Sequence, residues 1–431
     1  MSRAELAEEI CLWLWKATGK RYSLDERAIG RYERGAVQRP GASYRAALRH
    51  LFNATDTELG FTARPAPAAE PAAPAAAWDA ASTCVEIETI TEEDMATRRQ
   101  AIKTALAGAV LTVPLQLWLV PSPRIDVHEG AELTLHEVRA MEQTARQVKA
   151  LSSGALARRA IIAQLAEVGE RLKHAPSGPL RARVFAAASI LAETAASRSW
   201  DVGLHREAQR YYVLSVRLAH AAGNASLAAV ALAALSRQCY DLGQPGDGLE
   251  VVQLAQYGTR RSASPRMRSM LATREAWSYA QRGEVGAFQR AVGLAQDYHA
   301  DQVPDSDPYV SSFDEAELHG VIGARYRDLA RFRPEHAADA RHHIERALAT
   351  RAPSREKNRV FDLVGLARAE LIASEPERAA TLVEQALPLA GQFASGRVGV
   401  KLGEFHREAD RFDTVPAVRE IRTAIRDLIV V

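Results

Sequence analysis

The sequence predicts an all-α protein. From about residue 130 to the end, apolar residues recur every three or four positions, and no stretch alternates apolar and polar residues as a strand does. The breaks between these helical stretches carry glycine, proline or asparagine, which end helices. With 431 residues, of which 47% are hydrophobic, the chain is long and apolar enough for more than one buried core.

Residues 1–61 predict a small helical domain. A first helix begins near residues 4–7, with the sequence A-E-L-A, and continues through residues 11–16. The residues at 12–15 are all apolar, and consecutive helical residues point in different directions, so they cannot all face one core. Some of them are expected to cover a gap in the domain or to contact a second copy of the chain.

A second, short and basic helix is predicted around residues 27–35. Ser23 is a plausible N-cap, and the carboxylates at 25–26 lie in the first turn, where the helix dipole favours them. Gly35 stands where a left-handed residue would end the helix, and Pro40 prevents its continuation.

Three arginines give this helix a basic face. Arg27, Arg31 and Arg34 are spaced i, i+4 and i+7 and project from one side. Residues 16–49 hold nine lysines and arginines against three carboxylates, whereas the whole chain carries a net charge of only +2. Such a face suits phosphate and base-edge contacts in the major groove of DNA, although a solvated helix can carry the same pattern.

The run I-G-R-Y-E-R-G at 29–35, followed by R-P at 39–40, resembles the recognition helix of Xre-type, lambda-repressor-like helix-turn-helix regulators. Segments 44–48 and 57–61 resemble the closing helices of actinobacterial members. The resemblance implies a DNA-binding domain. Its contacts to phosphates or guanines would come from Arg27, Arg31 and Arg34, and its contacts to the DNA backbone from Lys20 and Arg21.

Two departures from that family leave an alternative open. Such domains have a helix before the L-A segment, so either the true start lies upstream of Met1 or this domain lacks its first helix. The connection at residues 18–22 is also longer than the usual turn of about four residues. A degenerate helix-turn-helix that does not bind DNA is therefore the alternative.

Residues 62–125 are predicted to connect two domains. The segment 62–82 holds four prolines among alanines and reads as a semi-extended linker. Arg98 and Arg99 precede an uncharged run at 104–120, an arrangement that resembles a twin-arginine export signal but lies at an internal position. The run is shorter than the roughly 20 residues of a membrane span, so a buried or linker helix is expected, with a membrane anchor or a remnant as alternatives.

Residues 126–431 predict an α-solenoid of tetratricopeptide-like helical hairpins. Gly203, Gly243 and Gly283 lie 40 residues apart, a longer step than the roughly 34 residues of an ideal tetratricopeptide repeat. A residue five positions after each glycine, and another seven further on, form pairs that are mostly small: Ala208 and Ser215, Gly248 and Ala255, Phe288 and Ala295, with Ala379 and Ala386 repeating the second step. Small residues there let paired helices approach closely, and stacked hairpins leave a concave groove.

Segments 263–268, 310–320 and 361–367 resemble actinobacterial regulators that join a helix-turn-helix to tetratricopeptide-like repeats. The resemblance implies that the repeats dimerise and sense a peptide or protein. Mixed charges and tyrosines on the first helix of each hairpin suit an extended peptide, or they solvate a concave surface. The candidate groove residues are Arg237, Gln238, Tyr240, Arg274, Glu275, Tyr279, Asp314, Glu317, Arg325, Tyr326 and Arg368.

The sequence contains no motif typical of an enzyme, a cofactor-binding protein or a metalloprotein. The motifs G-x-S-x-G, G-x-x-x-x-G-K-[ST] and H-E-x-x-H are absent, so neither an enzyme nor a cofactor is expected. The three cysteines are far apart, and His342 and His343 point about 100° apart on a solvated helix, so no metal site is expected. The sequence therefore predicts a cytoplasmic, homodimeric transcriptional regulator with no membrane contact, or alternatively an interaction scaffold.

Overall fold

The computed structural model describes two units of the chain, residues 1–76 and 77–431. The described residues are 2–18, 22–33, 37, 40–52, 54, 59, 78–96, 111, 115, 134–150, 155–174, 178–301, 307–393 and 396–430. Every regular element within those ranges is a helix, which confirms the all-α prediction.

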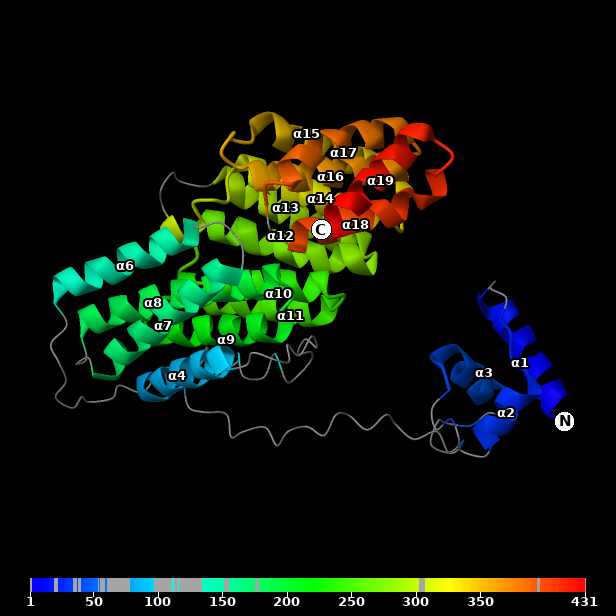
Figure 1. Ribbon diagram of the computed structural model, residues 1–431, viewed down its shortest axis with the longest axis horizontal. Coiled ribbons are helices and arrows are strands. Elements are labelled where there is room, and N and C mark those ends of the chain that lie inside the picture. The colour runs from blue at the N-terminus through cyan, green and yellow to red at the C-terminus, as the bar shows by residue number, and fades with distance from the viewer. Residues whose placement is uncertain are drawn as a thin grey trace. The chain divides into compact units, whose positions relative to one another are not determined.

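The first unit has three described helices. They are α1 (Arg3–Thr18), α2 (Glu26–Glu33) and α3 (Ala42–Phe52) (Figure 1). Helix α1 packs against both α2 and α3. Their shared core consists of Ala7, Ile10, Leu14, Ile29, Ala47 and Leu48.

The apolar run at 12–15 divides as its helical geometry requires. Leu14 is buried in the core, and the half-buried Trp13 stacks on His50 with ring centroids 5.1 Å apart. Leu12 is 41% exposed and Trp15 is 54% exposed.

The N-cap predicted for the second helix is wrong by two residues. The carboxylate of Asp25, not the hydroxyl of Ser23, accepts the backbone N–H of Ala28 at 2.7 Å. The reason is that α2 begins at Glu26, which makes Asp25 the residue directly before the helix. The C-terminal stop predicted at Gly35 lies outside the described residues.

The second unit contains α4 (Ala80–Ala96), α6 (Leu135–Ala150) and α7 (Ala155–His174), followed by a series of helical hairpins. The hairpins follow one another in chain order (Figure 1). They are α8 (Pro179–Asp201) with α9 (His205–Ala221), α10 (Ala225–Asp241) with α11 (Pro245–Thr259), α12 (Pro265–Arg282) with α13 (Val285–Ala300), α14 (Glu315–Ala330) with α15 (Ala337–Thr350), α16 (Glu356–Ile372) with α17 (Pro376–Ala390), and α18 (Gly396–Glu408) with α19 (Pro416–Val430). Short 3-10 helices occupy Pro308–Val310, Pro334–His336 and Ala409–Phe412.

The glycines of the 40-residue step form the turns inside the first three hairpins. Gly203, Gly243 and Gly283 have φ angles of 80°, 73° and 71°, in the left-handed region that favours glycine. Ser374 takes the same conformation between α16 and α17, with a φ of 63°. These turns therefore occur where a left-handed residue, usually glycine, ends the preceding helix.

The positions that follow the turn glycines are buried between helices. All eight predicted residues are buried, namely Ala208, Ser215, Gly248, Ala255, Phe288, Ala295, Ala379 and Ala386. A Cβ at Gly248 would lie 2.2 Å from a ring carbon of Tyr240, so α10 and α11 require glycine there. The large Phe288 fits because its ring packs edge to face on Tyr326, with centroids 4.8 Å apart.

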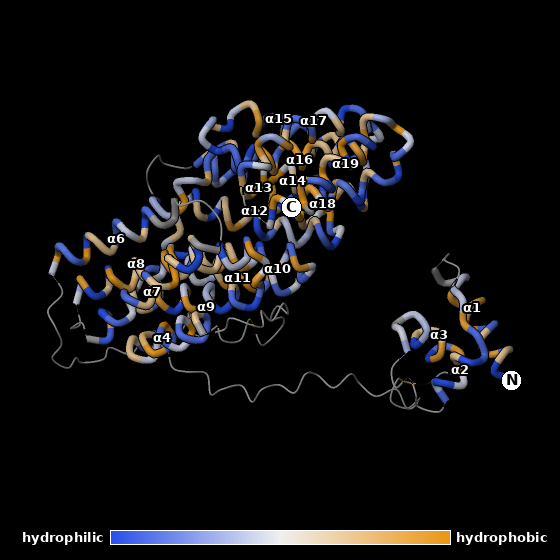
Figure 2. The backbone as a smooth tube through the Cα atoms, in the orientation of Figure 1, coloured by the Kyte–Doolittle hydropathy of each residue, from blue (hydrophilic) through white to orange (hydrophobic). Residues whose placement is uncertain are grey.

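The first helices of successive hairpins also contact one another. Helix α10 packs on α8 and α12, α14 on α12 and α16, and α16 on α18. Hydrophobic and hydrophilic residues both occur along the helices of the second unit (Figure 2). The first helices thus form a continuous inner layer.

Helix α4 lies within the segment that the sequence assigns to a linker. Trp78, just before α4, is 7% exposed and belongs to the core of the second unit. Asp94 of α4 accepts the hydroxyl of Tyr211 at 2.8 Å and pairs with Arg158. These contacts attach α4 to α7 and α9.

The apolar run at 104–120 is described only at two positions. Leu111 and Leu115 are buried in the core of the second unit, whereas Arg98 and Arg99 lie outside the described residues. Among the helices that the structure describes, none combines the length and the apolar character needed to cross a membrane.

Helix α18 contacts α8, so the last hairpin meets the first. Asp201, at the end of α8, has a fully buried side chain that pairs with Arg397 of α18 at 2.5 Å, 196 residues away. Lys357 and Arg198 each lie 3.6 Å from the same carboxylate. A Cβ at Gly396 would lie 2.5 Å from the carbonyl oxygen of Asp201, so glycine permits this approach.

Candidate functional site

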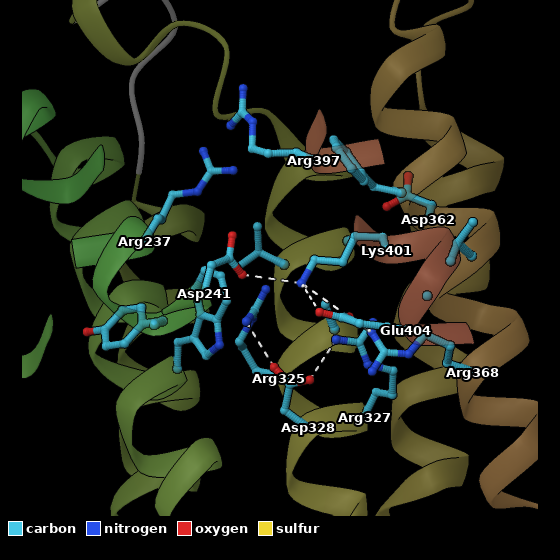
Figure 3. Close-up of a pocket in the computed structure, with 18 of the residues that line it drawn as sticks. Arg237, Asp241, Arg325, Arg327, Asp328, Asp362, Arg368, Arg397, Lys401 and Glu404 are labelled. Carbon is cyan, nitrogen blue, oxygen red and sulfur yellow. Dashed lines mark hydrogen bonds and ion pairs between the residues drawn. The ribbon is translucent and has the colours of Figure 1, made fainter. Parts of the chain in front are cut away.

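The inner layer of the second unit lines a partly open cavity of about 1000 Å³. Residues of α8, α10, α12, α14, α16 and α18 form most of its walls, together with single residues of α11 and α15 and the loops beside them. Figure 3 shows how several of the lining side chains lie. Ligand sites in proteins commonly have volumes of about 300 to 1000 Å³. The cavity is large enough for a ligand of several residues, and we treat it as the candidate site.

The lining of the cavity is strongly basic. Twelve cationic side chains line it: Arg198, Arg237, Arg274, Arg325, Arg327, Arg331, Arg351, Lys357, Arg368, Arg397, Lys401 and Arg407. Six carboxylates line it: Asp241, Glu317, Asp328, Asp362, Glu404 and Glu408. This excess of positive charge creates a potential that favours an anionic ligand.

Asp328 holds two arginines of α14 in position at the wall of the cavity. It accepts hydrogen bonds from Arg325 at 2.9 Å and from Arg327 at 2.6 Å. Burial alone would raise the pKa of Asp328, but the two guanidinium groups outweigh it and hold the pKa well below its usual range. The guanidinium of Arg325 also lies 3.2 Å from the ring centroid of Trp277, so both arginines are fixed in place.

A second network joins α16 and α18 to α10. Arg368 binds the carboxylates of Glu404 and Glu408 on α18. Lys401 extends from α18 to Glu404 at 3.0 Å and to Asp241 of α10 at 3.3 Å (Figure 3). Lys401 therefore links two helices that are far apart in the chain.

A third network centres on Arg351. Its guanidinium donates to Asp362 at 2.5 Å and to Glu317 at 3.1 Å, and Asn358 donates to Glu317 at 2.8 Å. Burial would raise the pKa of Glu317, but Arg351 and the more distant arginines of the cavity lower it. A Cβ at Gly320 would lie 2.7 Å from both Arg351 and Asp362, so glycine leaves room for this network.

Six of the predicted groove residues line the cavity: Arg237, Tyr240, Arg274, Glu317, Arg325 and Arg368. Gln238, Glu275 and Tyr326 do not, and each directly follows one of the six in sequence. Neighbouring residues on a helix point about 100° apart, and in these three pairs that rotation turns the second side chain away from the cavity.

The five remaining candidates have other contacts. Gln238 is buried and donates to the carbonyl of His205 at 3.0 Å. Glu275 accepts from Tyr279 at 3.0 Å and from Gln256 at 2.9 Å. Asp314 and Tyr326 make their contacts at helix α14.

Asp314 caps the N-terminus of α14 by accepting the backbone N–H of Glu317 at 2.8 Å. Tyr326 stacks on His343, with ring centroids 5.5 Å apart. Both side chains therefore hold the fourth hairpin together instead of lining the cavity.

Several lining residues were not among the sequence-based candidates. On α16, Lys357, Phe361 and Val364 share one face with the predicted Arg368, at steps of four, three and four residues. Arg397, Lys401, Glu404 and Glu408 repeat the same steps on α18. Once one lining residue is known on each of these two helices, the helical period predicts the others on the same face.

Two of the five predicted DNA-binding residues are described. Arg27 and Arg31 are exposed on α2, while Ala28, Ile29 and Gly30 form its buried side. Glu33, at the end of α2, pairs with Arg3 of α1 at 2.7 Å. Lys20, Arg21 and Arg34 lie outside the described residues.

The histidines of α15 differ from the solvated pair that the sequence predicts. His342 is exposed, but His343 lies between Tyr326 and His319, and the Nδ1 atoms of His319 and His343 are 2.8 Å apart. Within the ranges described above, no group of three or more histidine, cysteine or acidic side chains could hold a metal ion.

Because His343 is half-buried in this pair, we expect the folded protein to be less stable in acid. Burial, helped by the charges of His319 and His342, lowers the pKa of His343 from 6.5 to about 4. The unfolded chain therefore binds a proton that the folded protein excludes, and the free energy of unfolding should fall as the pH drops from about 6.5 to about 4. Melting temperatures across this range would measure the loss. His343→Phe keeps the stack on Tyr326 and should show a shallower loss, whereas an unchanged slope would contradict the assignment.

No protein-family model matches this chain, and comparison with curated proteins and with solved structures gave no match.

Proposed function

We propose that this protein is a transcriptional regulator that binds operator DNA through its first unit and is controlled by a peptide or protein segment bound in the cavity of its second unit. In this proposal it acts as a homodimer. It would belong with the Xre-type regulators that carry tetratricopeptide-like repeats, which the sequence resembles.

The observation that carries the proposal is the geometry of α2. This short helix buries Ala28, Ile29 and Gly30 and exposes Arg27 and Arg31 on its other side. An exposed helix with arginines one turn apart suits contacts to phosphates and to guanine edges. The basic excess of residues 16–49 would add electrostatic attraction to the duplex.

The cavity supports the regulatory half of the proposal. Its volume of about 1000 Å³ suits a short peptide better than a whole folded protein, so a protein ligand would insert an extended segment. Charged and polar side chains on several helices offer partners for the peptide backbone and for its charged ends.

DNA binding is tested with the full chain and a labelled duplex from the region upstream of its own gene. Arg27→Ala and Arg31→Ala should each weaken binding by about 1 to 3 kcal/mol in fluorescence anisotropy, because each removes a contact to DNA. Arg49→Ala removes the same charge from an exposed position on α3 and should have a smaller effect. Equal effects of all three substitutions would remove the proposed role of α2.

The alternative is an interaction scaffold that does not bind DNA. The observation that favours it is the small core of the first unit, whose hydrophobic cluster contains only six buried residues among those described. Wild-type protein that fails to bind duplex DNA at low salt, where phosphate contacts are strongest, would favour the scaffold.

A further inference from the structure

Arg274 of α12 is a buried cation without a carboxylate partner. Its side chain lines the cavity, and the residue is only 5% exposed. The Nε atom has no hydrogen-bond partner, and no carboxylate of the described chain forms an ion pair with the guanidinium. Burial and the nearby charge of Arg237 lower the pKa of Arg274 to about 9, so it still carries its charge at neutral pH.

Two further arginines, Arg237 and Arg325, act on the charge of Arg274. Arg237, on the adjacent helix α10, also lines the cavity and forms no ion pair with the described residues. Glu317 is the carboxylate whose charge acts on both arginines, but its hydrogen bonds go to Arg351 and Asn358. Buried nitrogen atoms of further lining residues lack partners as well, namely Nε of Arg325, Nε of Arg327 and Nε1 of Trp277.

This arrangement differs from the paired cations of the same cavity. Arg351 is also buried, at 9% exposed, but it binds both Asp362 and Glu317. A buried guanidinium without a partner destabilises a folded protein, because it loses its hydration and gains no compensating hydrogen bond. Arg274 therefore lowers the stability of the empty protein, unlike Arg351, and an acceptor from outside the chain would remove that deficit.

We propose that Arg237 and Arg274 form an oxyanion subsite that binds a carboxylate or phosphate group of the ligand in the cavity. The inference deepens the ligand-binding half of the proposed function and rests on it. A guanidinium binds either group through two parallel hydrogen bonds. The carboxylate would come from the C-terminus of a peptide and the phosphate from a small phosphorylated ligand.

The first test compares two variants of the full chain without ligand. Arg274→Met keeps the length of the side chain but removes the unpaired charge, so its melting temperature should equal or exceed that of the wild type. Arg351→Met leaves Asp362 and Glu317 buried without their partner and should lower the melting temperature. If Arg274→Met lowers it as much as Arg351→Met does, Arg274 has a structural role and the subsite is wrong.

The second test measures binding of three probes by isothermal titration calorimetry: inorganic phosphate, acetyl-trialanine with a free carboxylate, and the same peptide as its amide. The wild type should bind phosphate or the free acid, and whichever binds identifies the source of the oxyanion. Arg274→Met should weaken that binding about 30-fold or more, because a buried charge partner is lost. Wild type that binds neither anion, or a variant that binds as well as wild type, would overturn the subsite.

The outcomes separate this inference from the function on which it rests. If the amide binds as well as the free acid and Arg274→Met has no effect, the cavity binds peptide but the oxyanion subsite is wrong. DNA binding by α2 is measured independently with the duplex, so its failure would leave the calorimetric result unaffected.

Discussion

Replacing Asp201 with asparagine is expected to lower the free energy of unfolding by about 3 to 5 kcal/mol. The side chain of Asp201 is fully buried and is the shared partner of Arg397, Lys357 and Arg198. Burial alone would raise its pKa, but these cations lower it, so the carboxylate is charged in the folded protein. Asparagine keeps the shape of the side chain but leaves three cations close together without a counter-charge.

Urea denaturation of the full chain, followed by circular dichroism, would measure this loss. Asp241→Asn is a matched control, because Asp241 also joins α18 through Lys401, but its side chain is 21% exposed. A partly exposed pair contributes little, so that variant should lose less than about 1 kcal/mol. Amide hydrogen exchange in α18 should accelerate in Asp201→Asn and remain near wild type in Asp241→Asn. Similar losses in the two variants would contradict a special role for Asp201.

Replacing Gly323 with alanine is expected to destabilise the protein by about 1 to 3 kcal/mol. A Cβ there would lie 2.5 Å from Cγ1 of Ile344, 2.9 Å from its backbone nitrogen and 3.0 Å from the carbonyl oxygen of Ala340. Rotation of a side chain can relieve the first contact but not the two backbone contacts. Helices α14 and α15 must therefore move apart.

Gly293→Ala provides the control, because Gly293 lies within α13 and a Cβ there would meet nothing within 4 Å. Alanine favours the helix over glycine, so this variant should gain about 0.5 to 1 kcal/mol. Thermal melts of both variants would give opposite shifts. A loss in both, or a gain in both, would show that the distance between α14 and α15 is not the determining factor.

The hairpins of the second unit could be predicted from the sequence because their signals are local. A left-handed turn needs glycine at one position, and Gly203, Gly243 and Gly283 provide it at a constant step. Gly248 was predicted on the same pattern, and its contact with Tyr240 explains why a side chain cannot fit there. Ser374 shows the limit, because a residue other than glycine takes the same conformation without a sequence signal.

The cavity could be predicted only in part. The sequence places Arg274 and Arg325 on first helices. It does not give the rotation of each helix about its axis, so it predicts Glu275 and Tyr326 as groove residues together with them. The ion pair of Asp201 with Arg397 spans 196 residues and has no local pattern at all. Which charges are paired, and which are left without a partner as Arg274 is, depends on such distant contacts.

The contact between α8 and α18 has a consequence for how the second unit folds. In a linear array of repeats each unit is coupled only to its neighbours, so its stability is nearly a sum of local contributions. Here the first and last hairpins also contact each other, so they are coupled directly as well as through the hairpins between them. Because a long chain must be ordered before its ends can meet, this contact raises the contact order and should form late in folding. Damage to the last hairpin would then weaken the first directly, and the hairpins would unfold as one cooperative body instead of fraying from one end.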